Sequence, residues 1–314
     1  MLKEREDYIT ELNSLGLLDG KMGICIATFL MAVERSDEVL KEKAQDLLNH
    51  IAEQIADIES LNYADGLAGI GYGIEWLSQN NYIDINSDEV LSDIDDELYK
   101  AVVYTRSANA TLAEGILGKA LFFYKRLQAK NPNVNRYTTI CLNECLVLLS
   151  DELLDYFLDE ETGVFKREIS NLDEDEILLL SQSLIFFQKL YSIHINTDTA
   201  EKGICQITGF LERIFEEKSL FTKKNFIYLV HAYTNVAVKL KDSPWLATAK
   251  SIYIEWSNTQ NDFSFNVFTS YMHITLCKEF NINYTIDFPN NSNLTGLCLS
   301  SSQQDSYAKI WLLN

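Results

Sequence analysis

The chain has 314 residues, of which 47% are hydrophobic and 23% are charged, and its formal net charge is −20. The hydrophobic content is enough for a continuous core and excludes a disordered chain, while the negative charge repels phosphate backbones and excludes nucleic acid as a partner. The longest apolar stretch, ICIATFLMAV, is about half as long as the roughly 20 residues of a membrane-spanning helix, and the charged start MLKEREDYITELN does not resemble a signal peptide. We therefore expect no membrane partner and a cytoplasmic location.

Apolar residues recur at spacings of three and four along the chain, which predicts an all-α fold. The predicted helices, in chain order, cover residues 3–13, 20–34, 37–58, 67–80, 88–106, 114–129, 135–158, 173–194, 198–216, 222–240, 245–258, 264–280 and 296–312. Helices that are apolar on nearly all sides, and so must be buried, begin near residues 20, 66, 114 and 175. Helices with one charged face begin near residues 37, 88 and 198.

This alternation of buried and amphipathic helices indicates an array of six or seven helical hairpins, in which neighbouring hairpins supply one another's core. An open stack and a closed ring both fit the pattern. We favour the ring, an α/α toroid with inner and outer helices, because the inner helices lack a charged face that could line an exposed concave surface. No Pro-, Gly- or Ser-rich linker interrupts residues 1–314, so we expect a single domain.

Three helix starts share one pattern: an acidic residue, Gly, two variable residues, Gly, and then an apolar run. The copies read DGKMGICIATFL from Asp19, DGLAGIGYGIEWL from Asp65 and EGILGKALFFYK from Glu114. Aligned, they give a first glycine column of Gly20, Gly66 and Gly115, a second of Gly23, Gly69 and Gly118, and a small-residue column of Cys25, Gly71 and Ala120. A fourth copy, SNLTGLCLSSS, places Gly296 in the second column and Cys298 in the third.

Glycine inside a helix costs about 1 kcal/mol relative to alanine, so the columns need a physical reason. We expect the inner helices to meet at a common hub, where small residues permit close approach. We also expect Asp19, Asp65 and Glu114 to cap helix starts whose first-turn N–H groups form a polar rim at one mouth of the ring.

The repeat resembles the inner-helix signature of the lanthionine synthetase C-like (LanC-like) proteins, most specifically in residues 15–130. The resemblance implies an α/α toroid of seven inner and seven outer helices, and a role in a peptide-modification pathway of the lanthipeptide type. Cyclases of this family join a Cys thiol of a precursor peptide to a dehydrated Ser or Thr. Their zinc ion is held by a Cys at the start of the fifth inner helix and a Cys-His pair at the start of the sixth, with a catalytic His near the fourth.

The sequence departs from the family at these positions. The fourth, fifth and sixth segments begin EDEILLLSQSL, LFTKKNFIYLV and NDFSFNVFTSYM, with neither Cys nor His at the start. His231 and His273 lie several residues inside the fifth and sixth segments, and Cys298 is followed by Leu299 rather than His. We therefore expect no metal site and no cofactor, with zinc as the alternative. A divergent cyclase with a relocated site would need His231, His273 and Cys298 to approach one another.

Structural roles are the alternative explanation for these Cys and His residues. Cys25 and Cys298 fall in the small-residue column, where packing explains them, and His231 sits in YLVHAYTN among aromatic neighbours, as a buried structural histidine would. His231, His273, Asp65 and Glu114 are the candidate catalytic residues.

Two classes of function fit the sequence. In the first, a LanC-like accessory protein or scaffold binds a precursor peptide or a modifying enzyme, and its acidic surface attracts a basic partner. In the second, an α/α-toroid carbohydrate-active enzyme uses the carboxylates of Asp19, Asp65 and Glu114, since glycosidic cleavage needs two carboxyl groups about 5 to 10 Å apart. The sequence leaves open whether the protein is an enzyme.

Overall fold

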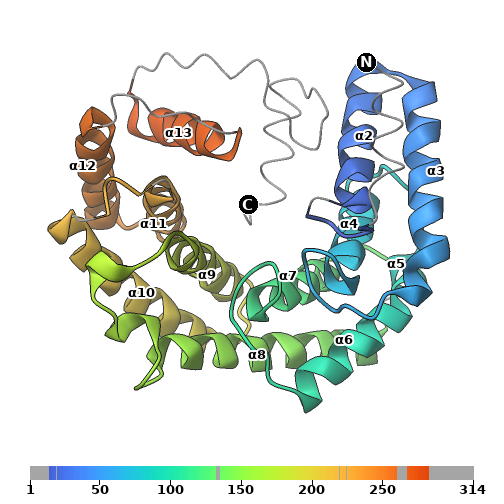
Figure 1. Cartoon of the computed structure of the whole chain (residues 1–314), viewed down its shortest axis with the longest axis horizontal. Helices are drawn as coiled ribbons and strands as arrows, with labels where there is room; N and C mark the ends of the chain where they lie inside the picture. Colours follow the sequence, from blue (N-terminus) through green and yellow to red (C-terminus); the bar gives the residue numbers. More distant parts are fainter. Residues whose placement is uncertain are drawn as a thin grey trace. The chain divides into compact units, whose positions relative to one another are not determined.

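The computed structural model describes residues 14–18, 20–131, 135–218, 220–223, 225–259 and 267–282. Within these ranges the chain forms twelve α-helices and three short 3-10 helices and no strand, which confirms the all-α prediction (Figure 1). Two predicted helices, 3–13 and 296–312, lie outside the described residues. No described helix combines the length and the hydrophobicity that crossing a membrane requires.

The chain divides into two compact units, and the division falls within α8 (Arg136–Leu158), between Leu149 and Ser150. Of the described residues, the first unit holds those up to Leu149 and the second holds those from Ser150 onward. The single domain expected from the sequence stays a prediction.

The first unit has a buried layer of helices covered by an amphipathic layer. Its elements are α2 (Lys21–Arg35), α3 (Glu38–Gln54), η1 (Ile55–Asp57), α4 (Leu67–Gln79), α5 (Ser87–Val90), α6 (Ser92–Tyr104), α7 (Ile116–Leu127) and the first part of α8. In the buried layer, α4 packs on both α2 and α7. Every residue of α2 from Met22 to Ala32 is buried, as expected for a helix that is apolar on all sides.

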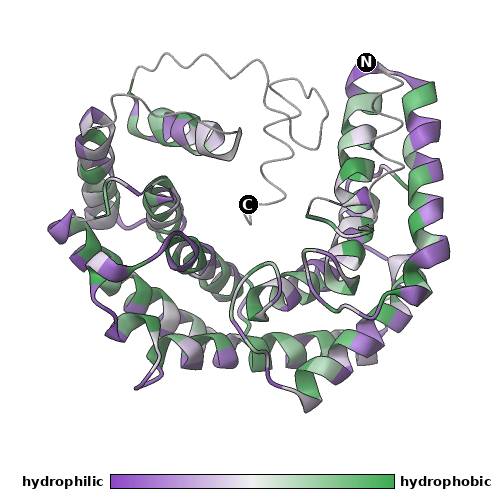
Figure 2. Ribbon diagram, viewed as in Figure 1, coloured by the Kyte–Doolittle hydropathy of each residue, from purple (hydrophilic) through white to green (hydrophobic). Residues whose placement is uncertain are grey.

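Amphipathic helices cover this buried layer: α3 packs on α2, and α5 and α6 pack on α4. The buried residues of α3 are Ala44, Leu48 and Ile51, at the spacing of three and four that places them on one face. Figure 2 shows hydrophilic residues along much of the length of α3.

The second unit repeats this arrangement. After the end of α8 it contains η2 (Val164–Lys166), η3 (Ile169–Asn171), α9 (Glu174–Ser192), α10 (Thr197–Glu217), α11 (Phe226–Leu240), α12 (Ser243–Thr259) and α13 (Val267–Phe280). Here α11 packs on α9 and α13, while α10 covers α9 and α12 covers α11. The predicted alternation of buried and amphipathic helices is therefore confirmed within each unit.

Two predicted helices differ from those in the structure, and both differences position side chains of the polar sites described in the next subsection. The predicted helix 37–58 ends as α3 at Gln54 and continues as η1. The predicted helix 88–106 is broken at Leu91 into α5 and α6, and the Asn86 side chain caps α5 by accepting from the Asp88 N–H at 3.2 Å. The short α5 brings Ser87 and Asp88 to the side chain of Arg126.

Candidate functional site: the loop row and its acidic pocket

The starts of α2, α4 and α7 are capped by backbone carbonyl groups of the loop that precedes each helix. The N–H of Lys21 donates to Ser14 O at 3.0 Å, that of Leu67 to Ser60 O at 2.9 Å, and that of Ile116 to Asn109 O at 3.1 Å. The same loops also receive later first-turn N–H groups, those of Met22, Gly69 and Leu117. These donors are thus satisfied within the chain and do not form the open polar rim expected from the sequence.

The expectation that acidic residues cap these helices is wrong for Asp65 and Glu114. The N-cap residues are Gly66 and Gly115, and neither helix start has a side-chain cap. The carboxylate of Asp65 accepts instead from the Ser60 hydroxyl at 3.0 Å, in the loop itself. Backbone capping leaves these acidic side chains exposed at the surface of the loops. Asp19 lies outside the described residues.

The glycine columns serve the same loops, and the common hub of helices expected from the sequence stays a prediction. A Cβ atom added to Gly66 or Gly115 would stand less than 3.0 Å from the backbone of the preceding loop, a distance that real Cβ atoms essentially never show. The same holds for Gly69 against Tyr63 O and for Gly118 against Leu112 O. Each helix start therefore carries glycine because its own loop folds back against it.

Gly20 repeats this arrangement against the backbone of Gly16, and Gly23 is buried in α2. Helix contacts explain the third column. A Cβ on Gly71 would meet the ring of Phe122 on α7, and the Cys25 thiol donates to Ala44 O on α3 at 3.4 Å. Burial raises the pKa of Cys25, so its thiol stays protonated and fills space in the core, as the packing interpretation expects. Gly296 and Cys298 lie outside the described residues.

The three loops interlock in a constant register. The Leu18 N–H donates to Ala64 O at 2.9 Å, and the Ala64 N–H donates to Ala113 O at 2.9 Å, so each loop pairs with the next one along the chain. Leu17 contacts Gly69, and Tyr63 contacts Gly118. Leu17 and Tyr63 each lie three residues before the first-column glycine of their own copy. Each contacts the second-column glycine of the next copy. We call residues 14–18, 60–66 and 109–115 the loop row.

An open pocket of about 490 Å³ lies at the edge of the loop row. Its lining residues come from the loop row, from the end of α3, and from η1 together with the residue that follows it: Ser14, Leu15, Gln54, Asp57, Ile58 and Asp65. The side chains of Asp57 and Asp65 are both exposed, so the pocket presents two carboxylates to solvent. We call it the acidic pocket. It contains Asp65, a candidate from the repeated motif, and Asp57, which lies outside that motif and so could not be recognised from it.

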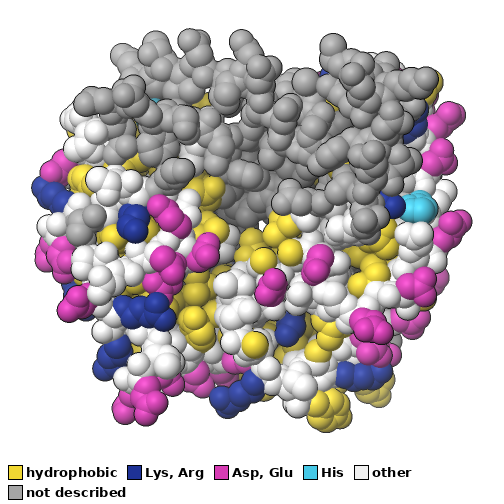
Figure 3. Space-filling view, in the orientation of Figure 1, with side chains coloured by type: hydrophobic (Ala, Val, Ile, Leu, Met, Phe, Trp, Pro, Cys, Tyr) yellow, Lys and Arg dark blue, Asp and Glu magenta, His cyan; other side chains and the backbone are white. Residues whose placement is uncertain are grey.

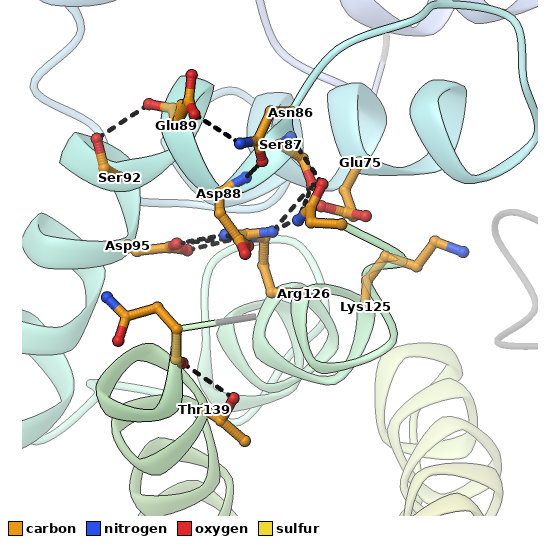
Figure 4. A network of polar contacts seen from close by, with 12 residues as sticks. Glu75, Asn86, Ser87, Asp88, Glu89, Ser92, Asp95, Lys125, Arg126 and Thr139 are labelled. Atoms are coloured by element: carbon orange, nitrogen blue, oxygen red, sulfur yellow. Dashed lines mark hydrogen bonds and ion pairs between the residues drawn. The ribbon is translucent and has the colours of Figure 1, made fainter. Parts of the chain in front are cut away.

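A second polar cluster surrounds Arg126, whose side chain is fully buried in the first unit (Figure 4). Its guanidinium donates to Glu75 of α4 at 2.7 Å, to Asp88 of α5 at 3.1 Å, and to both carboxylate oxygens of Asp95 of α6, with Nε–Oδ1 at 2.9 Å and Nη2–Oδ2 at 2.6 Å. The pair with Asp95 has the parallel, two-bond geometry of strong Arg–carboxylate contacts. The cluster therefore joins four helices of the first unit.

The charges of this cluster are unbalanced, because one guanidinium faces three carboxylates. Burial raises the pKa of Asp95, although the hydrogen bonds and charge of Arg126 act in the opposite direction. Burial alone would lower the pKa of Arg126, but its hydrogen bonds with Asp95 and Glu75 and their charges raise it above its ordinary value. The cluster lies outside the repeated motif, and its only signals in the sequence are a lone Glu in the apolar run GYGIEWL and an Arg in LFFYKRL.

His231 lies on α11, and its side chain is 3% exposed. Burial lowers its pKa to about 4, so the imidazole is neutral at pH 7. Its ring is 6.2 Å from that of Tyr271 on α13, measured between centroids. These surroundings fit the structural alternative for His231, and its position in a groove is taken up below.

His273 lies on α13 and faces α12. The Tyr253 hydroxyl oxygen is 2.6 Å from Nδ1 of His273 and 3.0 Å from Sγ of Cys277, which lies one turn further along α13. Burial lowers the pKa of His273, and burial raises that of Cys277 while the hydrogen bond with Tyr253 lowers it. The cluster holds a neutral imidazole and a protonated thiol, which is a poor nucleophile.

The structure does not bring the two candidate histidines together. His231 approaches α13 at Tyr271, and a residue two positions away on a helix is turned by about 200°, which places His273 on the opposite face. The relation of either histidine to Cys298 lies outside the described residues. Within the described ranges, no three or more His, Cys, Asp or Glu side chains are grouped so that they could hold a metal ion.

The comparisons with known proteins add no relative. The chain matches no protein-family model, and no curated protein matches it in sequence.

Proposed function

We propose that the protein is a LanC-like scaffold of a peptide-modification pathway, and that it binds a basic segment of a precursor peptide or of a modifying enzyme at the acidic pocket. The observation that carries the proposal is that Asp57 and Asp65 both line a pocket set against the loop row. The glycine motif that resembles the LanC-like family builds this row, so the motif and the pocket are parts of one feature.

The pocket suits a lysine or arginine side chain. Its volume of about 490 Å³ falls within the range of about 300–1,000 Å³ that is typical of ligand sites. Leu15 and Ile58 offer apolar surface for the aliphatic stem of such a side chain, while the two carboxylates lie where its charged end would bind. Gln54 and Ser14 add hydrogen-bonding groups for the adjoining peptide backbone.

The backbone pairing of the loops makes this surface a preorganised one. Each loop is hydrogen-bonded to the next and packs closely against a glycine. The wall of the pocket therefore loses little conformational entropy when a peptide binds. The proposed scaffold binds a peptide but does not carry out zinc-dependent cyclisation. This agrees with the sequence at the starts of α11 and α13, where other residues stand in place of the Cys and His zinc ligands of the LanC-like cyclases. The closed α/α toroid is part of the same proposal and is supported by the two-layer arrangement of each unit.

A titration tests the proposal. A short labelled peptide of alternating Lys and Ser is added to the full chain, alongside a matched peptide of Glu and Ser. We expect saturable binding of the Lys peptide alone. The double substitution Asp57→Asn and Asp65→Asn should weaken it roughly fivefold to tenfold, since each exposed ion pair contributes up to about 1 kcal/mol. Binding should also fall as the ionic strength approaches roughly 1 M, where the Debye length is about 3 Å.

The matched control removes the same charge elsewhere: Asp155→Asn and Glu160→Gln, both exposed in the second unit, should leave the affinity nearly unchanged. An equal loss in the control would show that only net charge matters and would contradict the assignment of the pocket. Turnover of a glycoside panel that disappears in Asp65→Asn would instead favour the carbohydrate-active alternative.

A further inference from the structure

A second concave site lies entirely within the second unit, between α11 and α13. This groove has a volume of about 120 Å³. Its walls are formed by His231, Thr234, Asn235, Val238 and Lys239 of α11 and by Thr275, Leu276 and Glu279 of α13. The proposed binding of a basic peptide makes no use of it.

The most buried polar side chain of the groove is that of His231. His231 lines the groove although it is 3% exposed, and neither of its ring nitrogens has a hydrogen-bond partner among the described residues. A neutral imidazole offers one donor and one acceptor, so the base of the groove can receive either kind of polar group.

Two hydroxyl groups add acceptors. The Thr234 hydroxyl donates to Val230 O at 2.7 Å, and the Thr275 hydroxyl donates to Tyr271 O at 2.9 Å, each within its own helix. Because these bonds use the hydroxyl hydrogens, the two oxygens can serve only as acceptors toward a ligand. Val238 and Leu276 supply the apolar part of the lining.

Opposite charges stand at the rim of the groove. Lys239 and Glu279 are both exposed, and neither forms an ion pair with another described residue. An ammonium group would be attracted to Glu279 and to the threonine oxygens, and a carboxylate to Lys239. A ligand with both groups would use both ends, whereas a ligand with a single charge would meet one like-charged side chain.

Size limits the ligand further. A cavity of about 150 Å³ holds benzene, so a groove of about 120 Å³ holds a molecule of roughly six heavy atoms, well below the size of a peptide or a drug. We propose that this groove binds a small zwitterion, an α-amino acid of the size of glycine or alanine, with its ammonium toward Glu279 and its carboxylate toward Lys239.

Calorimetric and ligand-observed NMR titrations of the full chain with glycine and alanine test this site, with acetate and methylamine as single-charge controls. We expect saturable binding of the amino acids with a dissociation constant between roughly micromolar and millimolar, the range open to so small a ligand. Acetate and methylamine should bind at least about tenfold more weakly, because each lacks one charge-assisted contact.

Variants assign the binding to the groove. Glu279→Gln and Lys239→Met should each weaken amino-acid binding about tenfold or more, and both change exposed side chains, so the fold should persist. Glu201→Gln and Lys202→Met, exposed on α10, are the matched controls and should bind like the unaltered chain. The proposal is overturned if neither amino acid saturates the protein, if the single-charge ligands bind as tightly, or if the groove variants behave like the controls.

Discussion

At Arg126 a single guanidinium is hydrogen-bonded to carboxylates from three different helices, Glu75 of α4, Asp88 of α5 and Asp95 of α6. Bringing such charges out of water costs several kcal/mol per ion, and only good geometry among the partners offsets that cost. The two-bond pair with Asp95 supplies that geometry, but three carboxylates would repel one another without the arginine. The stability of the first unit should therefore depend strongly on this one side chain.

Arg126→Met should lower the free energy of unfolding by about 3 to 5 kcal/mol, because it leaves buried carboxylates without their cation. Chemical denaturation followed by circular dichroism measures the change. Arg167→Met removes an ion pair with Glu176 in which the arginine is exposed, and should cost less than about 1 kcal/mol. Equal losses in the two variants would contradict the role given to Arg126.

His231 gives the stability of the protein a pH dependence with a definite sign. Burial lowers its pKa from 6.5 to about 4, so the folded state binds fewer protons than the unfolded state between these values. The contribution of the neutral His231 imidazole to the free energy of unfolding is fully present above pH 6.5 and is lost as the pH falls toward 4. This contribution amounts to about 3 kcal/mol. Unfolding free energies measured across this window should fall less steeply in His231→Leu than in the unaltered chain. His194→Asn, at an exposed position, should keep the original slope, and a His231→Leu slope equal to it would refute the assignment.

At the scale of the element, the starts of α2, α4 and α7 depend on glycine because loop backbone occupies the space of a side chain. The nearest obstructing atoms at Gly69 and Gly118 are carbonyl oxygens, which cannot turn aside as a flexible side chain can. A substitution there must displace the loop, and with it the pairing between neighbouring loops.

Gly69→Ala should destabilise the protein by about 1 to 3 kcal/mol, in the manner of an overpacked core. Gly209→Ala is its counterpart in α10, where an added Cβ would meet nothing within 4 Å, and it should stabilise the protein by about 0.5 to 1 kcal/mol. Thermal unfolding of the two variants compares them directly. A stabilising effect of Gly69→Ala would show that the loop does not press against the helix as described.

The helices and their alternation could be predicted from sequence because the spacing of apolar residues reflects which face each helix buries. MGICIATFLMA in α2 is buried throughout, while α3 buries only a stripe. The glycine positions could also be recognised, but their cause could not. Whether a glycine faces another helix or its own loop depends on the path of the loop backbone, which leaves no periodic signal. For the same reason Asp57 and Asp65 were not paired in advance.

For the whole molecule, the dominant quantity is its net charge of −20. Figure 3 shows Asp and Glu side chains spread over the described face, interspersed with fewer Lys and Arg. Such a field speeds the approach of a basic partner and is screened by salt, but it does not by itself choose a binding position. We propose that the acidic pocket determines where the basic partner binds.

Amide hydrogen exchange of the full chain, with and without the Lys–Ser peptide, tests the central claim most directly. We predict slower exchange on binding in residues 57–66 and at Leu15, around the acidic pocket, and unchanged exchange in α10 of the second unit. Protection confined to the second unit, or spread evenly over the chain, would contradict the assignment of the acidic pocket as the binding site.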